Sequence, residues 1–166
     1  MNKLRIALLG TLVLAGQQVL AAGFITPQEF VTRASAAGLG EVELGKLALE
    51  KSSAADIRAF AQKMVEDHGK SGAELAALAR ARMLSVASQP SEAQRTALAQ
   101  LRQKSGQQFD TAWTEQMTKD HDEAVLLFSA AGTLEDDDKE LAAFARKTLP
   151  VLTGHQQLAA HLGKVH

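Results

Sequence analysis

Four long stretches of this chain carry apolar residues at alternating spacings of four and three, and this periodicity restricts the fold more than any other feature. Such spacing places one apolar stripe along one face of an α-helix. No stretch shows the alternation of apolar and polar residues that is typical of a β-strand. We therefore expect an all-α fold, with long helices near 27–51, 53–83, 107–131 and 138–163 and a short extra helix near 91–104.

The connections between the long helices are short, which favours antiparallel neighbours. The expected architecture is an up-down antiparallel four-helix bundle, with the short helix before the third long one. Residues that favour helix starts support these limits: Thr26 with Pro27, and Ser53 with Asp56 three residues later. An acidic turn at 135–138 should favour the positive end of the last helix.

The amino terminus has the organisation of a signal peptide. Two basic residues precede an apolar run at 6–15, and Val19-Leu20-Ala21 fits the small-x-small cleavage rule. We expect residues 1–21 to be removed, and residues 22–166 to form a single exported, periplasmic domain. The run is shorter than the roughly 20 residues of a membrane span, so no stable membrane insertion is expected after cleavage. An uncleaved amino-terminal anchor is the alternative.

Composition narrows the classes of partner and chemistry. Lys and Arg number 18 against 19 Asp and Glu, which gives a formal net charge of −1. So weak a charge does not favour nucleic acid or anionic membranes as partners. The chain has no cysteine, so disulfides and thiolate chemistry are excluded. The protein partner and the oligomeric state are left open.

One polar residue interrupts each apolar stripe close to the middle of its helix. These residues are Glu41, His68, His121 and His155. Because an α-helix rises about 1.5 Å per residue, all four lie at similar height, where antiparallel helices meet. One inward polar residue per helix in a single layer is the arrangement of a metal centre in a helical bundle. We predict that the four bind one zinc or iron ion, because imidazole and carboxylate groups suit these metals. A hydrogen-bonded layer that fixes helix register is the alternative.

Asp67 and Asp120 directly precede two of these histidines and therefore point about 100° away from them around the helix. We expect each aspartate to orient a histidine of an adjacent helix by hydrogen bonding, as carboxylates do around metal sites. A helix–helix ion pair or a surface position is the alternative for both. Met64 and Met117 lie one turn before the same two histidines and are predicted as core residues, with copper ligation as the alternative.

Several of these motifs resemble one family. The motifs are Phe30-Val31, the segments 40–48 (GEVELGKLA) and 60–68 (FAQKMVEDH), Phe109-Asp110, Met117 with Asp120-His121, and Leu149-Pro150 with His155. Together they resemble the domain of unknown function numbered 4142 (DUF4142), over nearly all of residues 22–166. The resemblance implies a bacterial envelope protein that forms a ferritin-like helical bundle and has no established activity. Ferritin-like oxidases carry Glu-x-x-His on two helices. This chain has no such motif, so their di-iron chemistry does not transfer with the fold.

Three functions are consistent with these residues. The first is a periplasmic protein that sequesters or senses a transition metal. The second is a non-enzymatic envelope interaction or stress-protection protein whose Glu/His layer is structural. The third, a mononuclear metalloenzyme, is the least favoured, because the sequence has neither a Ser-His-Asp order nor a glycine-rich phosphate loop. No catalytic residue is predicted.

Overall fold

The computed structural model describes residues 25–134 and 138–166, so the predicted signal peptide, its cleavage after Ala21 and most of the acidic turn lie outside the described residues. The described residues form five helices and no strand, which confirms the predicted all-α class. The helices are α1 (Pro27–Lys51), α2 (Ala55–Ala81), α3 (Glu92–Arg102), α4 (Gly106–Ala131) and α5 (Lys139–Leu162). None of the described helices is both long and apolar enough to cross a membrane.

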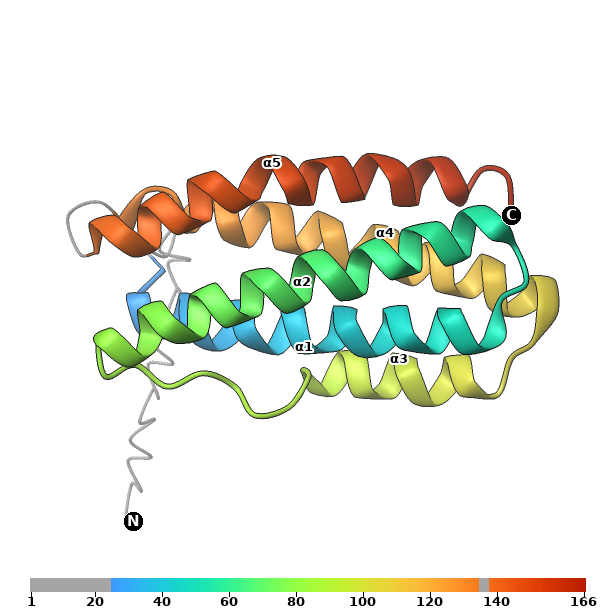
Figure 1. Ribbon diagram of the computed structural model, residues 1–166, viewed down its shortest axis with the longest axis horizontal. Helices are drawn as coiled ribbons and strands as arrows, with labels where there is room; N and C mark the ends of the chain where they lie inside the picture. Colours follow the sequence, from blue (N-terminus) through green and yellow to red (C-terminus); the bar gives the residue numbers. More distant parts are fainter. Residues whose placement is uncertain (1–24, 135–137) are drawn as a thin grey trace, which may run out of the picture.

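The four long helices lie side by side, as Figure 1 shows. α1 packs mainly on α2, and α4 packs mainly on α5. Between these two pairs, α1 contacts α4 and α2 contacts α5. Each helix in chain order, α3 included, runs opposite to the one before it (Figure 1). α2 and α4 therefore run in the same direction, and α3 lies outside the four, against α1 and α4.

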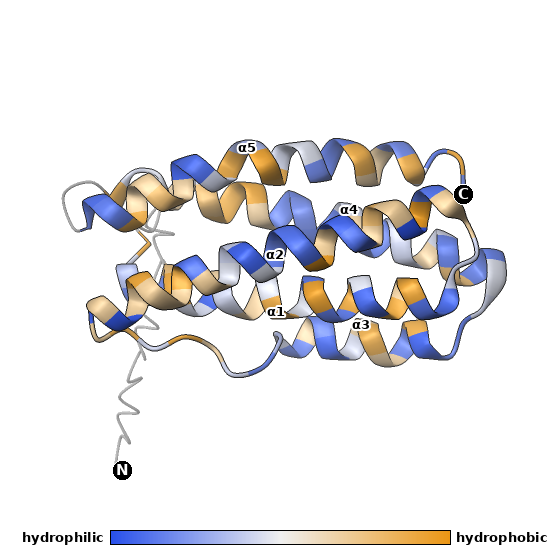
Figure 2. Cartoon of the chain, in the orientation of Figure 1, coloured by the Kyte–Doolittle hydropathy of each residue, from blue (hydrophilic) through white to orange (hydrophobic). Residues whose placement is uncertain are grey.

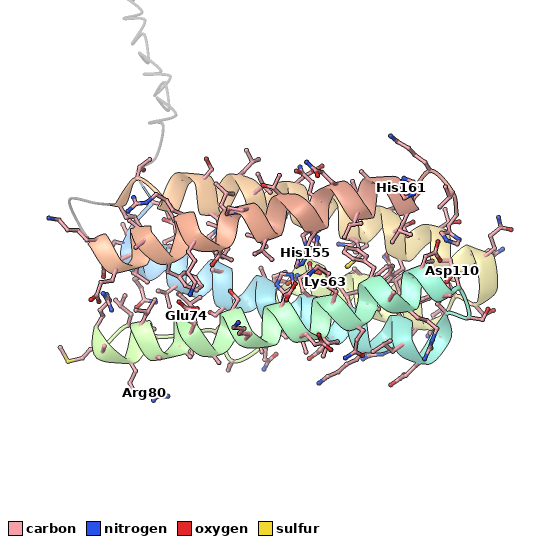
Figure 3. The ribbon with its side chains drawn as sticks, turned by 45° about the horizontal axis from the view of Figure 1, so that its top comes forward. Lys63, Glu74, Arg80, Asp110, His155 and His161 are labelled. Atoms are coloured by element: carbon pink, nitrogen blue, oxygen red, sulfur yellow. The ribbon has the colours of Figure 1, made fainter. Side chains whose placement is uncertain are left out.

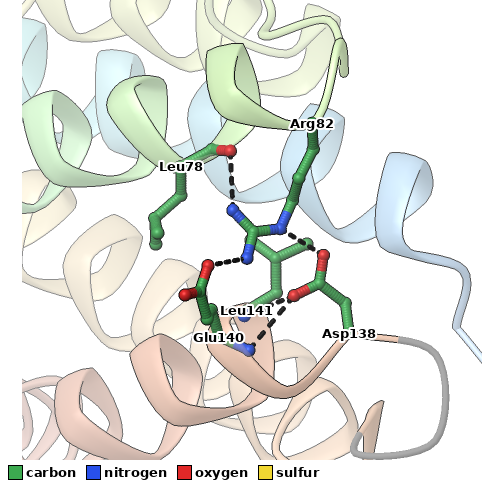
Figure 4. Close-up of polar contacts among 5 residues, drawn as sticks. All are labelled: Leu78, Arg82, Asp138, Glu140 and Leu141. Atoms are coloured by element: carbon green, nitrogen blue, oxygen red, sulfur yellow. Dashed lines mark hydrogen bonds and ion pairs between the residues drawn. The ribbon is translucent and has the colours of Figure 1, made fainter.

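Side-chain caps begin α1 and α5. The Thr26 hydroxyl accepts a hydrogen bond from the backbone N–H three residues later, at 3.2 Å, as the sequence predicts. The Asp138 carboxylate accepts from the backbone N–H groups of Glu140 and Leu141, at 3.1 and 3.0 Å. Arg82, just after α2, donates to the carboxylates of both Asp138 and Glu140 (Figure 4). The end of α2 is thereby joined to the start of α5.

The start of α2 differs from the prediction. The prediction that Ser53 caps this helix is wrong. α2 begins at Ala55, and the residue at the cap position, Ala54, makes no side-chain cap bond. The hydroxyl of Ser52 instead accepts the N–H of Ala54 at 3.2 Å. A serine that bonds the backbone two residues later forms a local turn, which competes with the cap geometry.

The end of α2 forms a Schellman turn whose left-handed position holds Met83 (φ 57°) instead of glycine. The backbone N–H of Leu84 donates to the carbonyl of Ala79 at 2.9 Å, and that of Met83 donates to Arg80 at 3.2 Å. The Met83 side chain is 94% exposed, so packing does not compensate for the unfavourable backbone conformation.

Two apolar clusters fill the space between the helices, one toward each end. Hydrophobic segments recur along every helix in Figure 2. In the first cluster, the ring of Phe30 meets that of Phe128 edge-on, with centroids 5.1 Å apart. In the second, the indole N–H of Trp113 on α4 donates to the carbonyl of Leu44 on α1 at 3.0 Å. Between the two clusters lies a polar layer made of Glu41, His68, His121 and His155. We refer to these four residues as the Glu/His layer.

α1 and α2 approach each other closely at Gly45. A Cβ atom at this position would lie 2.9 Å from the backbone oxygen of Ala61 and 3.0 Å from Cγ2 of Val65. Only glycine leaves room for this contact. Because Gly45 lies one turn after Glu41, the contact fixes the height of Glu41 relative to α2.

Candidate metal centre

The structure brings the four predicted residues to one place. Glu41 projects from α1, His68 from α2, His121 from α4 and His155 from α5, and none is more than 9% exposed. All four line the same cavity. Figure 3 shows His155 pointing from α5 into the space between the helices, near the middle of their length. Each residue continues the apolar stripe of its own helix, which explains why all four face inward.

The three histidines form the compact part of this layer. Their ring centroids are 5.6 Å apart for His68 and His121, 5.5 Å for His68 and His155, and 5.4 Å for His121 and His155. One ring nitrogen from each lies within 4.8 Å of the other two. Over residues 25–134 and 138–166, this group contains only the histidines; Glu41 lines the cavity but lies outside the group.

Each of the three histidines has one buried ring nitrogen without a protein partner. Nδ1 of His121 donates to the carbonyl oxygen of Met117 at 2.8 Å, and Nε2 of His155 donates to the Asp67 carboxylate at 2.9 Å. Nε2 of His121, Nδ1 of His155 and Nε2 of His68 have no partner among the described residues. We call these three atoms the open nitrogens. In His121 and His155 the other nitrogen carries the proton, so the open nitrogen holds the lone pair that a metal needs.

Burial keeps the histidines uncharged. It lowers the pKa of His68 from 6.5 to about 3, and the positive charges that His121 and His155 could carry lower it further. Burial likewise lowers the pKa of His121 to about 4, against the opposing hydrogen bond to Met117. The pKa of His155 is also lowered by burial, although Asp67 opposes the shift. Neutral imidazole, the metal-binding form, is therefore the resting state of all three at neutral pH.

Asp67 lies beside the layer and holds His155 in place. Its carboxylate accepts hydrogen bonds from His155 on α5 and from Lys63 on its own helix, at 2.9 and 2.8 Å. Partial burial raises the pKa of Asp67, but the bonds from Lys63 and His155 outweigh this and hold the pKa below its ordinary value. The aspartate therefore stays ionised and fixes both the ring orientation and the tautomer of His155.

Asp120 makes a different contact, with Glu41 and not with a histidine. Burial raises the pKa of Glu41 well above 4.5, and the charge of Asp120 raises it further. Burial also raises the pKa of Asp120, whose carboxylate accepts a hydrogen bond from Gln116 at 2.8 Å. The two carboxyl groups thus form a hydrogen-bonded pair that holds a proton on Glu41. Oε2 of Glu41 and Oδ2 of Asp120 have no partner in the described part of the chain, and we call them the open oxygens.

Met64 and Met117 belong to one of the two apolar clusters. Both side chains are fully buried there, with Phe60 and Trp113. The Phe60 ring lies next to the layer, with its centroid 6.4 Å from that of His121 and 6.1 Å from that of His155. Phe60 thus forms an apolar boundary on this side of the histidines.

A cavity of about 180 Å³ adjoins the layer and is lined by residues of all four long helices. The lining residues that are exposed, Lys70, Lys147 and Val151, belong to α2 and α5. The cavity therefore opens to solvent along the seam between these two helices. An ion pair between Glu74 on α2 and Lys147 on α5, with a 2.8 Å contact, crosses the seam.

Sequence reasoning missed Lys63, the Glu41–Asp120 pair and the cavity. Lys63 could have been found, because it lies four residues before Asp67, a spacing that is typical of ion pairs on one helix. The Glu41–Asp120 pair and the cavity depend on which side chains meet between different helices, and spacing within a helix does not predict this.

A family model described as "Domain of unknown function (DUF4142)" matches residues 14–162. The chain belongs to this family. The DUF4142 protein is also similar to the crystal structure of a DUF305 fragment from Deinococcus radiodurans, with a TM-score of 0.71 and 20% sequence identity. The similarity covers 86% of the DUF4142 chain and 99% of the other chain, and at this identity it shows the fold alone. No curated protein matches the DUF4142 chain by sequence.

Proposed function

We propose that this DUF4142 protein binds a single transition-metal ion, zinc or iron, through His68, His121 and His155. One observation carries the proposal: three buried, neutral imidazoles offer nitrogens within 4.8 Å of one another. Leaving a buried polar atom without a partner costs roughly 1–3 kcal/mol. One ion would offset this cost at all three open nitrogens.

The spacing of the nitrogens fits a small ion. A tetrahedral zinc with Zn–N distances of about 2.0–2.1 Å holds its ligands about 3.3 Å apart. Closing from at most 4.8 Å to that spacing requires ring rotations and not movements of whole helices. The Asp67–His155 hydrogen bond supports the proposal too, because metal-bound histidines almost always donate their second N–H to a carboxylate or carbonyl. His121 likewise donates its second N–H to a carbonyl, that of Met117.

The proposed scaffold is a ferritin-like four-helix bundle that is exported to the periplasm. Two helical pairs, α1 with α2 and α4 with α5, joined by a segment that contains α3, support the bundle. The basic start, short apolar run and Val19-Leu20-Ala21 site support export with cleavage after Ala21. Mass spectrometry of the mature protein tests the export proposal; an intact Met1 on membrane-bound protein would contradict it. In the periplasm the site would sequester or sense the metal.

A second candidate function is an envelope interaction or stress-protection protein in which the Glu/His layer is purely structural. The Asp67–His155 bond, between α2 and α5, and the Glu41–Asp120 pair, between α1 and α4, favour this alternative, because both link separate helices. Buried polar networks of this kind can fix the register of packed helices.

Metal content and chelator sensitivity distinguish the two functions. The mature chain is purified from the periplasm without a histidine tag, analysed for bound metal, and melted with and without chelator. His68→Ala is the test variant, and His161→Ala, at an exposed position of α5, is the matched control. A metal site predicts one ion per chain, a lower Tm with chelator, and loss of both the ion and the chelator effect in His68→Ala alone. A wild type without metal that ignores chelator, together with a destabilised His68→Ala, would reject metal binding.

A further inference from the structure

The cavity beside the histidines has two chemically different regions. One is bordered by the three histidines and by Glu41 and Asp120, whose open oxygens are buried. The other is bordered by apolar side chains, among them Leu75, Phe128 and Leu152. A volume of about 180 Å³ exceeds the space that a single metal ion fills. The cavity therefore has room for a second small species next to an ion.

Three protein ligands do not complete the coordination of zinc or iron. Zinc takes at least four ligands, and a site with three protein ligands keeps a position for water or another small molecule. Glu41 lies outside the compact group of histidines and pairs with Asp120, so the protein ligands that the geometry brings together are the three histidines. Since all three histidines line the cavity, an ion that they bind faces it.

The charge around the site favours an anion as the additional ligand. Three neutral imidazoles leave the double positive charge of the ion unbalanced. Asp67 is already bonded to Lys63, and Asp120 accepts hydrogen bonds from Gln116 and Glu41. Because the surroundings are buried and of low polarity, the remaining charge attracts a small monoanion strongly. The open oxygens of Glu41 and Asp120 carry no proton, since the proton of the pair lies between the two carboxyl groups, so they can accept the O–H of a bound hydroxide.

The route to the site runs between α2 and α5. This seam carries the exposed lining residues of the cavity, among them Val151 on α5, which is 42% exposed. Leu158 lies on the same helix and is 43% exposed, but it does not line the cavity.

We propose that the ion held by the three histidines keeps one coordination position open to the cavity, and that a small monoanion, hydroxide included, binds there after entering between α2 and α5. This inference rests on the proposed function, since it requires that His68, His121 and His155 bind the ion. It adds the class of ligand that the site accepts and the path that the ligand takes.

The full mature chain loaded with Co²⁺ and titrated with sodium azide tests the proposal. Co²⁺ suits the same ligands as zinc, and its visible absorption reports changes in coordination. We expect one Co²⁺ per chain and a saturable spectral change on adding azide. Val151→Trp should narrow the entrance and slow the spectral change on adding azide by at least about tenfold. Leu158→Trp places the same side chain on α5 away from the cavity and should bind azide at the wild-type rate.

The outcomes separate this inference from the function on which it rests. A chain that binds no Co²⁺ would overturn the proposed function, and this inference with it. Bound Co²⁺ whose spectrum ignores azide would overturn only the open position. Equal rates of azide binding in Val151→Trp and Leu158→Trp, each folded by circular dichroism and loaded with one Co²⁺, would overturn the entry between α2 and α5.

Discussion

Burial, more than any neighbouring charge, sets the protonation of the inward residues. It is the largest influence on the pKa of Glu41, which it raises, and on the pKa values of His68 and His121, which it lowers. Burial thus favours the neutral form of the carboxylic acid and of both imidazoles. A site built in this way offers neutral imidazoles to a cation without help from a nearby base.

Glu41→Gln should remove a loss of stability that the wild type suffers as pH rises. The pKa of Glu41 is raised by folding, so its contribution is fully present below its unfolded value of 4.5 and is lost as pH rises toward the folded value. Glutamine does not titrate. In urea denaturation of the metal-free proteins, the stability of Glu41→Gln relative to wild type should therefore increase above pH 4.5, by at most roughly 1.4 kcal/mol per pH unit. A difference that stays constant with pH would contradict the protonated Glu41.

The sequence predicts which residues face inward, because an apolar stripe of fixed period leaves little freedom in the direction of each side chain. It does not predict what those residues bond to. That His121 donates to its own helix while His155 donates to Asp67 on another depends on ring rotation and on helix contacts. The same limit explains why the pairing of Glu41 with Asp120 does not follow from the sequence.

At the scale of single helices, the existence and limits of all five follow closely from periodicity and caps. Thr26 with Pro27 fixes the start of α1 as expected. The two deviations both concern α2, where Ser52 displaces the expected cap and Met83 takes the position that glycine would favour. Local hydrogen bonds and one unfavourable φ angle decide these ends, and neither affects the apolar period.

Met83→Gly should stabilise the protein by about 0.5–1 kcal/mol, because glycine adopts a positive φ without the steric cost that methionine bears. Met83→Ala is the matched control: it also removes the exposed side chain but keeps a Cβ atom in the left-handed conformation. Thermal melts of the two variants should differ, with only the glycine variant above wild type. An equal rise in Tm in both variants would show that the exposed side chain, and not the backbone conformation, destabilises the wild type.

Gly45→Ala and Gly69→Ala should have opposite effects. A methyl group at Gly45 meets the backbone of Ala61 at 2.9 Å, so the two helices must separate, which we expect to cost about 1–3 kcal/mol. At Gly69 nothing lies within 4 Å, and alanine should stabilise the helix by up to about 1 kcal/mol. Chemical denaturation measures both, and a stabilised Gly45→Ala would contradict the close packing of α1 and α2.

At the scale of the whole molecule, the Glu/His layer makes stability depend on pH in two directions. The pKa values of His68 and His121 fall from 6.5 to about 3 and about 4 on folding, and that of His155 falls as well. Below pH 6.5 the unfolded chain therefore binds more protons, and stability decreases as pH is lowered. Glu41 acts in the opposite sense above pH 4.5. The pKa of Asp120 is raised as well, so Asp120 acts in the same sense as Glu41. Three histidines outweigh these two carboxyl groups, so the metal-free protein should be most stable near about pH 6.5.

Denaturation curves of the metal-free protein between pH 4 and 8 check this maximum. His68→Gln should reduce the decline on the acid side, because glutamine takes up no proton, and it should leave the alkaline side unchanged. Stability that rises steadily toward pH 4 would contradict the neutral, buried histidines.

The division of the core by the Glu/His layer has a consequence for how the molecule opens. Helices usually fray from their ends, but here the apolar clusters lie toward both ends and the cavity adjoins the layer between them. Without metal, backbone amides at mid-helix should exchange with deuterium at least as fast as those within the clusters. An ion in the layer would reverse this order, so that the helix ends become the first parts to open.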